Sequence, residues 1–311
     1  MSGVEGPTTE ANRVAAAGAP GACPLGCLGQ PSPRFVLAGF AVMHCPQCDL
    51  CFLGPGGGSA ASLLDRGEFE DAFYSLRVAN YDTILTELAH LGSGRQLLDV
   101  GCSSGWFLSR ALTRGYDCHG IEPDEFFLQQ ARRRLPSTIE LVHGLFDNDV
   151  PAAWGGFDVI TFHDVFEHVP EPVSTLEACR RRLAPDGLIV LSVPSSAGFV
   201  YAIGTWLYRL GFGGPLERMY QVHYPYPHLF YFNDRSIAVL ADRAGFDVVR
   251  SFGLAGFSVR GALHRARMDK AAGMLGHLRN AVSAAALASF ALIQYGLPSD
   301  NAVFILKPKP I

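Results

Sequence analysis

The residues with the clearest chemical potential lie together in the segment 97–108, which reads LLDVGCSSGWFL. An apolar run ends at Asp99, small residues follow, and apolar residues then recur at helical spacing. This pattern predicts a buried strand that turns tightly into a helix, the place where α/β sheets bind nucleotide-like cofactors. Gly101 and Gly105 let the backbone approach a ligand closely, and Asp99 can accept hydrogen bonds from the ligand's amino or hydroxyl groups.

The loop alone leaves its cofactor open. A dinucleotide site favours G-x-G-x-x-G, whereas the order here is D-x-G-x-S-x-G, with the acid two residues before the first glycine. Small residues in a strand-to-helix turn also serve the turn itself. We expect Ser103 or Ser104 to be the N-cap of the helix that follows.

Further polar residues follow the next predicted strands. Glu122 ends a strand about twenty residues beyond the glycines, where an acid binds the ribose hydroxyls of an adenosine. Asp124 is instead the expected N-cap of the next helix. A third strand, 139–142, leads into a turn that contains Leu145 and Phe146.

A fourth predicted strand, 157–162, runs into the residues HDVFEHVPEP at 163–172. Together with the D-x-G-x-S-x-G loop, this segment resembles the class I S-adenosylmethionine-dependent methyltransferases, and the resemblance extends over residues 78–252. Ser103 stands where a glycine is usual, and Leu145 stands where the family often has an acid that meets the adenine amino group. The resemblance implies S-adenosylmethionine as the cofactor. It implies a cofactor site made of Asp99, Gly101, Ser103, Gly105, Glu122, Pro123, Leu145, Phe146, His163 and Asp164.

The resemblance and the alternation of strands with helical segments predict the same fold class. We expect an α/β fold with a Rossmann-like seven-stranded methyltransferase sheet and helices on both faces. In the family, a last strand such as 302–306 completes the sheet as its antiparallel member. The expected parts are a disordered tail over 1–20, a zinc-ribbon-like module over 21–53, a linker and N-terminal helices over 54–91, and the methyltransferase domain over 92–311, with an aromatic lid insertion at 197–232.

Five of the eight cysteines lie near the N-terminus. Cys23 and Cys27 form one pair, and Cys45 and Cys48 form a second pair after a short β-like stretch. Two pairs of thiolates are typical of a tetrahedral structural Zn²⁺ site, and a reducing cytoplasm makes disulfides the weaker explanation. In related methyltransferases with such a module, Cys51 falls at an apolar strand position, so we expect it to pack. A module without metal is the alternative, because the first pair has one residue more than the commonest spacing.

The acceptor side is expected in the insertion after the fifth strand. Residues 197–216 are apolar and aromatic, and residues 221–234 resemble a P-x-H-L-x-x-F segment that borders the acceptor pocket in the family. A hydroxyl acceptor must lose a proton, and histidine is the usual base near neutral pH. The candidate bases are, in order of preference, His228 and His168, followed by His163 and His223.

Composition restricts the partners. The chain has 311 residues and a formal net charge of -4, and it has no basic stripe interleaved with aromatic residues, so nucleic acid is not the expected partner. No signal peptide is visible, which predicts a cytoplasmic protein. Interior glycines and Arg209 argue against stable membrane insertion of 197–216, while contact with a lipid-like substrate stays open. Residues 281–293 are expected to form a buried or oligomer-facing helix, which leaves a homo-oligomer open.

The expected function is methyl transfer to a small molecule, with a hydroxyl oxygen of a sugar or secondary metabolite as the acceptor. Carbon or nitrogen as the acceptor atom is the nearest alternative. A zinc-ribbon binding protein whose methyltransferase core no longer turns over is an alternative of another class. An NAD-dependent oxidoreductase is less favoured, because the glycine spacing differs and no Tyr-x-x-x-Lys pair follows the fourth strand.

Overall fold

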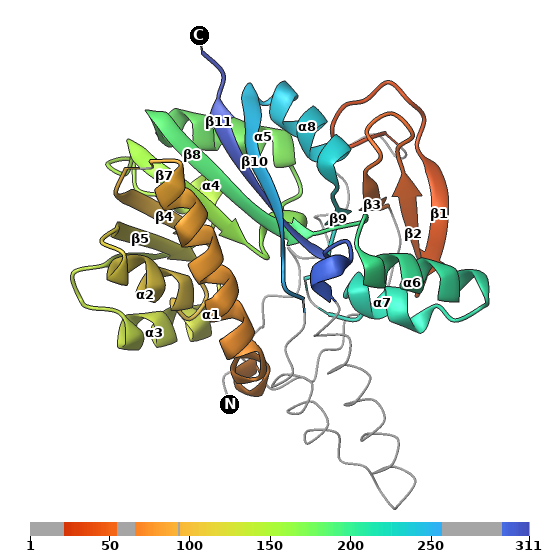
Figure 1. The fold of residues 1–311 in the computed structure, drawn as a ribbon, viewed down its shortest axis with the longest axis horizontal. Helices are drawn as coiled ribbons and strands as arrows, with labels where there is room; N and C mark the ends of the chain where they lie inside the picture. The colour runs from red at the N-terminus through yellow and green to blue at the C-terminus, as the bar shows by residue number, and fades with distance from the viewer. Residues whose placement is uncertain (1–21, 55–65, 93, 225, 257–293, 311) are drawn as a thin grey trace, which may run out of the picture.

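The computed structural model describes residues 22–54, 66–92, 94–224, 226–256 and 294–310. Within this part of the chain, the strands form a large central sheet and a small sheet beside it (Figure 1). The predicted tail over 1–20 and the buried or oligomer-facing helix expected at 281–293 lie outside the described residues. No helix in the described ranges combines the length and the apolar character needed to span a membrane.

The central sheet has seven strands and is largely parallel. Its parallel strands are β4 (Gln96–Val100), β5 (Asp117–Glu122), β6 (Glu140–His143), β7 (Phe157–His163) and β8 (Leu183–Pro194). The strand β11 (Asn301–Pro308) runs antiparallel to both β8 and β10 (Phe246–Leu254). The order across the sheet is β10-β11-β8-β7-β4-β5-β6. The antiparallel strand predicted at 302–306 is therefore confirmed.

Helices cover both faces of this sheet, as predicted. One face carries α1 (Arg66–His90), α2 (Trp106–Thr113) and α3 (Glu125–Arg134), and the other carries α5 (Pro172–Arg182) and α8 (Asp234–Arg243) (Figure 1). Successive residues of a strand point to opposite faces, so Leu97 belongs to one core cluster and Leu98 to the other. This burial on two sides explains why β4 reads as a continuous apolar run.

The small sheet joins two segments that are far apart in the sequence. Its strands are β1 (Ser32–Leu37), β2 (Phe40–His44), β3 (Cys51–Leu53) and β9 (Phe230–Tyr231), all antiparallel. We call residues 22–54, which include β1, β2 and β3, the cysteine module. The strand β9 comes from the insertion after β8, whose helices are α6 (Phe199–Arg209) and α7 (Gly214–Met219). In Figure 1 these two helices lie directly beneath β1, β2 and β3.

The prediction for the start of α2 is wrong. Neither Ser103 nor Ser104 caps this helix; the N-cap is Gly105, at φ 76°, and no side-chain cap bond is formed there. Ser103 has a positive φ of 47°, and its backbone N–H donates to the Glu122 carboxylate instead. The N-cap predicted at Asp124 is confirmed, because its side chain accepts a hydrogen bond from the backbone N–H of Phe126.

Candidate functional site

The glycine loop lies at the carboxyl end of β4, between β5 and the segment that follows β7. The backbone N–H of Gly101 donates to the carbonyl of Ile121 at 2.8 Å, and Gly105 donates to Cys102 at 2.9 Å. Gly101 has φ 69°, and a Cβ built there would stand 2.5 Å from Cγ2 of Val165. Both the backbone conformation and the close approach of Val165 therefore require glycine at this position.

Glu122 holds this loop from the end of the neighbouring strand. Its Oε2 accepts from the backbone N–H of Ser103 at 2.8 Å, and its Oε1 accepts from the backbone N–H of Asp124 at 2.9 Å. The residue is buried, at 6% exposure.

Asp99 is the second carboxyl group beside the loop. It is buried, and the hydroxyl of Thr161 donates to its Oδ1 at 2.7 Å. Burial raises the pKa of Asp99 to about 8, against the hydrogen bond from Thr161, which lowers it. Thr161 was not among the sequence candidates, although it occupies the position in β7 that pairs with Asp99 of β4. Knowledge of that strand pairing would have identified it.

The two predicted cofactor residues in the turn after β6 (Glu140–His143), Leu145 and Phe146, differ in exposure. Leu145 is 55% exposed, and its backbone N–H already donates to the side chain of Asp149. Phe146 begins the short helix α4 (Phe146–Asp149) and packs edge-on against Phe162 in the core. Pro123 lies across from this turn, with its carbonyl 2.9 Å from Nε2 of His143. Leu145 is therefore available at the surface, whereas Phe146 is not.

His163 and Asp164 end β7 beside the loop. The ring of His163 lies 4.1 Å from the ring of Phe107 and 5.3 Å from that of Tyr81, centroid to centroid. Its two nitrogens are buried and form no hydrogen bond with the described residues, and burial lowers the pKa of His163 to about 3. Asp164 is exposed, has φ 54° and accepts a hydrogen bond from Asn301 at 3.1 Å.

The structure brings together the two preferred candidate bases and one acid, which we call the histidine cluster: Glu167, His168 and His228. Glu167 and His168 belong to the short 3-10 helix η2 (Phe166–His168). The rings of His168 and His228 lie 4.9 Å apart, and Nε2 of His228 lies 3.9 Å from Oε1 of Glu167. Each residue offers one ligand atom, and these atoms lie within 4.8 Å of one another, so the cluster has the composition of a cation site or of a proton relay.

Hydrogen bonding fixes the state of His168. Its Nδ1 lies 2.9 Å from the carbonyl oxygen of Pro227, which can only accept. Nδ1 is therefore protonated, and in the neutral ring Nε2 carries the free lone pair. Burial lowers the pKa of His168 and lowers that of His228 to about 3, so both rings are neutral at pH 7. Burial also raises the pKa of Glu167 well above its usual range.

His223 does not join the histidine cluster. It is exposed and faces Glu217, with Nε2 3.5 Å from the carboxylate. Oε2 of Glu167 and Nδ1 of His228, by contrast, are buried and have no hydrogen-bond partner among the described residues. Glu167 was not among the site residues predicted from the sequence; its position beside His228 arises from packing between segments about sixty residues apart.

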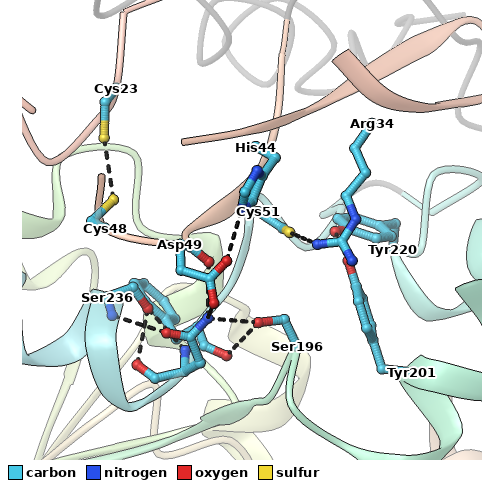
Figure 2. Close-up of polar contacts among 12 residues, drawn as sticks. Cys23, Arg34, His44, Cys48, Asp49, Cys51, Ser196, Tyr201, Tyr220 and Ser236 are labelled. Atoms are coloured by element: carbon cyan, nitrogen blue, oxygen red, sulfur yellow. Dashed lines mark hydrogen bonds and ion pairs between the residues drawn. The ribbon is translucent and has the colours of Figure 1, made fainter. Parts of the chain in front are cut away.

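The four cysteines predicted to bind metal form one buried cluster. Cys23, Cys27, Cys45 and Cys48 offer sulfur atoms within 4.8 Å of one another, and all eight cysteines of the chain are free thiols. A tetrahedral zinc with Zn–S bonds of about 2.3 Å places its sulfurs about 3.8 Å apart. Sγ of Cys23 and Sγ of Cys48 are 3.6 Å apart, so this set fits the ion. Cys51 lies apart from the cluster, with Arg34 donating to its sulfur at 3.1 Å (Figure 2).

Comparison with known proteins agrees with this geometry. A family model described as a methyltransferase domain matches residues 69–251, which is more than half of the chain. The ubiquinone biosynthesis O-methyltransferase of Alkalilimnicola ehrlichii is 36% identical over 106 residues, which cover 32% of this chain and 41% of the relative. The protein of the same name from Psychrobacter cryohalolentis is 32% identical over 127 residues, which cover 38% and 49%. The chain thus spans less than half the length of these relatives.

A solved structure shows the same fold. A putative sarcosine dimethylglycine methyltransferase from Galdieria sulphuraria superimposes with a TM-score of 0.51 at 16% identity, over 79% of this chain and 92% of that one. At this identity the likeness concerns the fold alone, while the family match rests on the sequence. The chain belongs to the class I S-adenosylmethionine-dependent methyltransferases.

Proposed function

We propose that this chain transfers the methyl group of S-adenosylmethionine to a hydroxyl oxygen of a small molecule, of the sugar or secondary-metabolite kind. The observation that carries the proposal is that Asp99, the loop 101–105 and Glu122 lie together at the carboxyl ends of β4 and β5. The names of the matched relatives, ubiquinone biosynthesis O-methyltransferases, favour oxygen as the acceptor atom.

The residues around the loop suit an adenosine-containing cation. Glu122 would accept from the ribose hydroxyls, and Asp99 would accept from an amino or hydroxyl group. Exposed Leu145 offers an apolar surface to the adenine, whereas Phe146 contributes packing beneath it. When bound, the cofactor supplies an electrophilic methyl group on sulfur. The other residues proposed to line this site are Gly101, Ser103, Gly105, Pro123, His163 and Asp164.

The histidine cluster is the proposed source of the base. The acceptor oxygen forms its bond to the methyl carbon, the carbon–sulfur bond breaks with its electrons kept by sulfur, and the hydroxyl proton passes to a histidine. The geometry favours His168, because Pro227 holds its Nδ1–H and leaves Nε2 as the lone pair. His228 is the second candidate. A positive charge on His228 would lower the pKa of Glu167, whose Oε1 lies 3.9 Å from Nε2 of His228, and the ionised carboxylate would stabilise that imidazolium.

Calorimetry tests the cofactor class first. We expect S-adenosylmethionine and S-adenosylhomocysteine to bind, and NAD not to bind. Binding of NAD alone would overturn the proposal. Incubation with methyl-¹³C-labelled cofactor and hydroxylated probes, a catechol and a nucleotide sugar, then tests the acceptor. The methyl carbon shift of the product distinguishes an oxygen-bound methyl group from one on carbon or nitrogen.

Two variants test the base. We expect His168→Asn to reduce turnover by about 10²- to 10⁴-fold while the affinity for S-adenosylhomocysteine stays unchanged. His228→Asn tests in the same assay whether His228 is the base instead. If both variants keep full turnover on an acceptor that the wild type methylates, neither histidine is the base.

We also propose a structural Zn²⁺ held by Cys23, Cys27, Cys45 and Cys48, which implies a reducing compartment such as the cytoplasm. Metal analysis of the purified protein should give one zinc per chain. Cys48→Ser should lose that zinc, whereas Cys51→Ser, which removes an equally buried thiol outside the cluster, should keep it. Equal zinc content in both variants would contradict the assignment.

A further inference from the structure

The cysteine module is bound directly to the segment that carries His228. Strand β3 pairs with β9, with Cys51 opposite Tyr231 and Phe52 opposite Phe230. The ladder continues one residue further, where the backbone N–H of Leu53 donates to the carbonyl of Leu229 at 2.8 Å. The backbone that follows His228 is therefore the outer strand of the sheet that the cysteine module builds.

The other side of the same segment contacts the histidine cluster. The carbonyl of Pro227 accepts from His168, and the backbone N–H of Leu229 donates to the carbonyl of Glu167 at 2.9 Å. Residues 227–233 therefore connect the cysteine module to Glu167 and His168. A shift of this segment would change both the position of His228 and the hydrogen bond that sets the tautomer of His168.

Asp49 connects the cysteine cluster to the end of this segment. It lies between Cys48 and β3 with a positive φ of 62°, and its backbone N–H donates to the carbonyl of Cys45 at 2.8 Å. Its Oδ1 lies 2.7 Å from Nε2 of His44, as Figure 2 shows. Its Oδ2 and its backbone carbonyl accept from the amide of Asn233, at 3.1 Å and 2.8 Å.

Asn233 also forms hydrogen bonds with two elements of the methyltransferase fold. Its side chain caps α8 by accepting from the backbone N–H of Ser236, which bonds back in a capping box. Its amide also donates to the hydroxyl of Ser196, just beyond the end of β8, at 3.0 Å. Asn233 is itself buried, so its amide depends on these acceptors in place of water.

We propose that the cysteine module positions the segment 227–233, with Asp49 as the positioning residue between the metal site and that segment. The module has three short strands, and its buried side chains belong to clusters shared with the rest of the protein, so it has little core of its own. A structural zinc supplies the folding free energy of such small units. Loss of the metal therefore loosens β3 and Asp49, and through them the histidine cluster. The cofactor loop, which follows β4 in the central sheet, keeps its structure.

Hydrogen exchange of the full-length protein tests this coupling. Chelation of zinc, or Cys48→Ser, should speed amide exchange in residues 229–237 by at least about tenfold and leave residues 97–108 unchanged. The affinity for S-adenosylhomocysteine should stay within about threefold, because the cofactor loop is not part of the coupled region. Unchanged exchange at 229–237, an equal rise at 97–108, or a purified protein without zinc would each overturn the inference.

Variants that retain zinc distinguish a positioning role of Asp49 from a general loss of stability. Asp49→Ala should retain zinc and still speed exchange at 229–237, and Asp49→Asn, which keeps a side-chain oxygen acceptor, should restore most of the protection. Asp186→Ala is the matched control, because Asp186 is 91% exposed and its ion-pair partner within the described part of the chain is Lys307. An effect of Asp49→Ala no larger than that of Asp186→Ala would refute the role of Asp49.

This inference rests on the proposed function only for its catalytic meaning. Failure to bind S-adenosylhomocysteine would refute the proposed function whatever the exchange rates show. The coupling between the metal site and the segment 227–233 is measured without any acceptor, so the two failures are distinguishable.

Discussion

Two glycines with nearly the same φ allow the requirement for glycine in the cofactor loop to be measured. Gly101 has φ 69° and Gly92 has φ 68°. A Cβ at Gly101 would stand 2.5 Å from Cγ2 of Val165, whereas a Cβ at Gly92 meets no atom of the described residues within 4 Å. Alanine at either position incurs the same conformational cost, so the difference between the two variants isolates the close contact.

The expected losses in the free energy of unfolding follow from the backbone strain of alanine and from the close contact with Val165. A left-handed alanine costs about 1–2 kcal/mol, offset by about 0.4–1 kcal/mol from the smaller entropy of the unfolded chain. Gly92→Ala should therefore lower the free energy of unfolding by about 1 kcal/mol. Gly101→Ala should lower it by a further ~1–3 kcal/mol, the usual cost of overpacking a buried site.

Urea denaturation of both variants measures this difference, and calorimetry with S-adenosylhomocysteine measures its effect on the site. If the loop yields rather than Val165, the dissociation constant for S-adenosylhomocysteine rises about 5- to 150-fold, the equivalent of 1–3 kcal/mol. Gly92→Ala should leave this constant unchanged. Equal stability losses, together with wild-type affinity in Gly101→Ala, would refute the argument that Val165 restricts the loop.

Two further predictions concern protonation. Because the pKa of Asp99 is about 8 in the free protein, its carboxyl group is mostly protonated at pH 7, and a cationic ligand that lowers this pKa releases a proton on binding. The binding heat of S-adenosylmethionine should thus depend on the ionisation enthalpy of the buffer in the wild type but not in Asp99→Asn. His163 has a folded pKa of about 3, below its unfolded value, so the unfolded state binds the extra proton and stability falls as the pH drops from 6.5 towards 3. Between pH 7 and pH 5 this contribution is about 2 kcal/mol, and urea titration of His163→Leu at the two pH values should show its loss.

The cofactor side was largely predictable because its information is local. The strand, the loop and the next acid follow one another within 97–122, and parallel pairing of β4 with β5 places their carboxyl ends together. Apolar runs identified the buried strands. The loop conformation was not predictable: Ser103 resembles an N-cap by type, but the Glu122 carboxylate takes its backbone N–H and the helix begins later.

The acceptor side could not be assembled from the sequence, because its contacts join distant segments. The strand β9 has two residues and no pattern of its own; it exists through its pairing with β3. Likewise, Asp49 and Asn233 are 184 residues apart, and neither type signals the other. By contrast, residue type and pairwise spacing were enough to identify the four cysteines that the structure brings together.

The burial of the histidine cluster favours an acceptor that gives up a proton. Burial favours the neutral forms of Asp99 and Glu167, by raising their pKa values, and of His168 and His228, by lowering theirs. Methyl transfer from a sulfonium to an oxygen that loses its proton removes the positive charge from sulfur and passes it to the base as a proton. In a poorly solvated site that charge is costly unless a carboxylate lies near, and an ionised Glu167, 3.9 Å from Nε2 of His228, would supply one. Two neutral histidines beside Glu167 therefore suit an acceptor that loses a proton on methylation, whether that proton leaves oxygen, nitrogen or carbon.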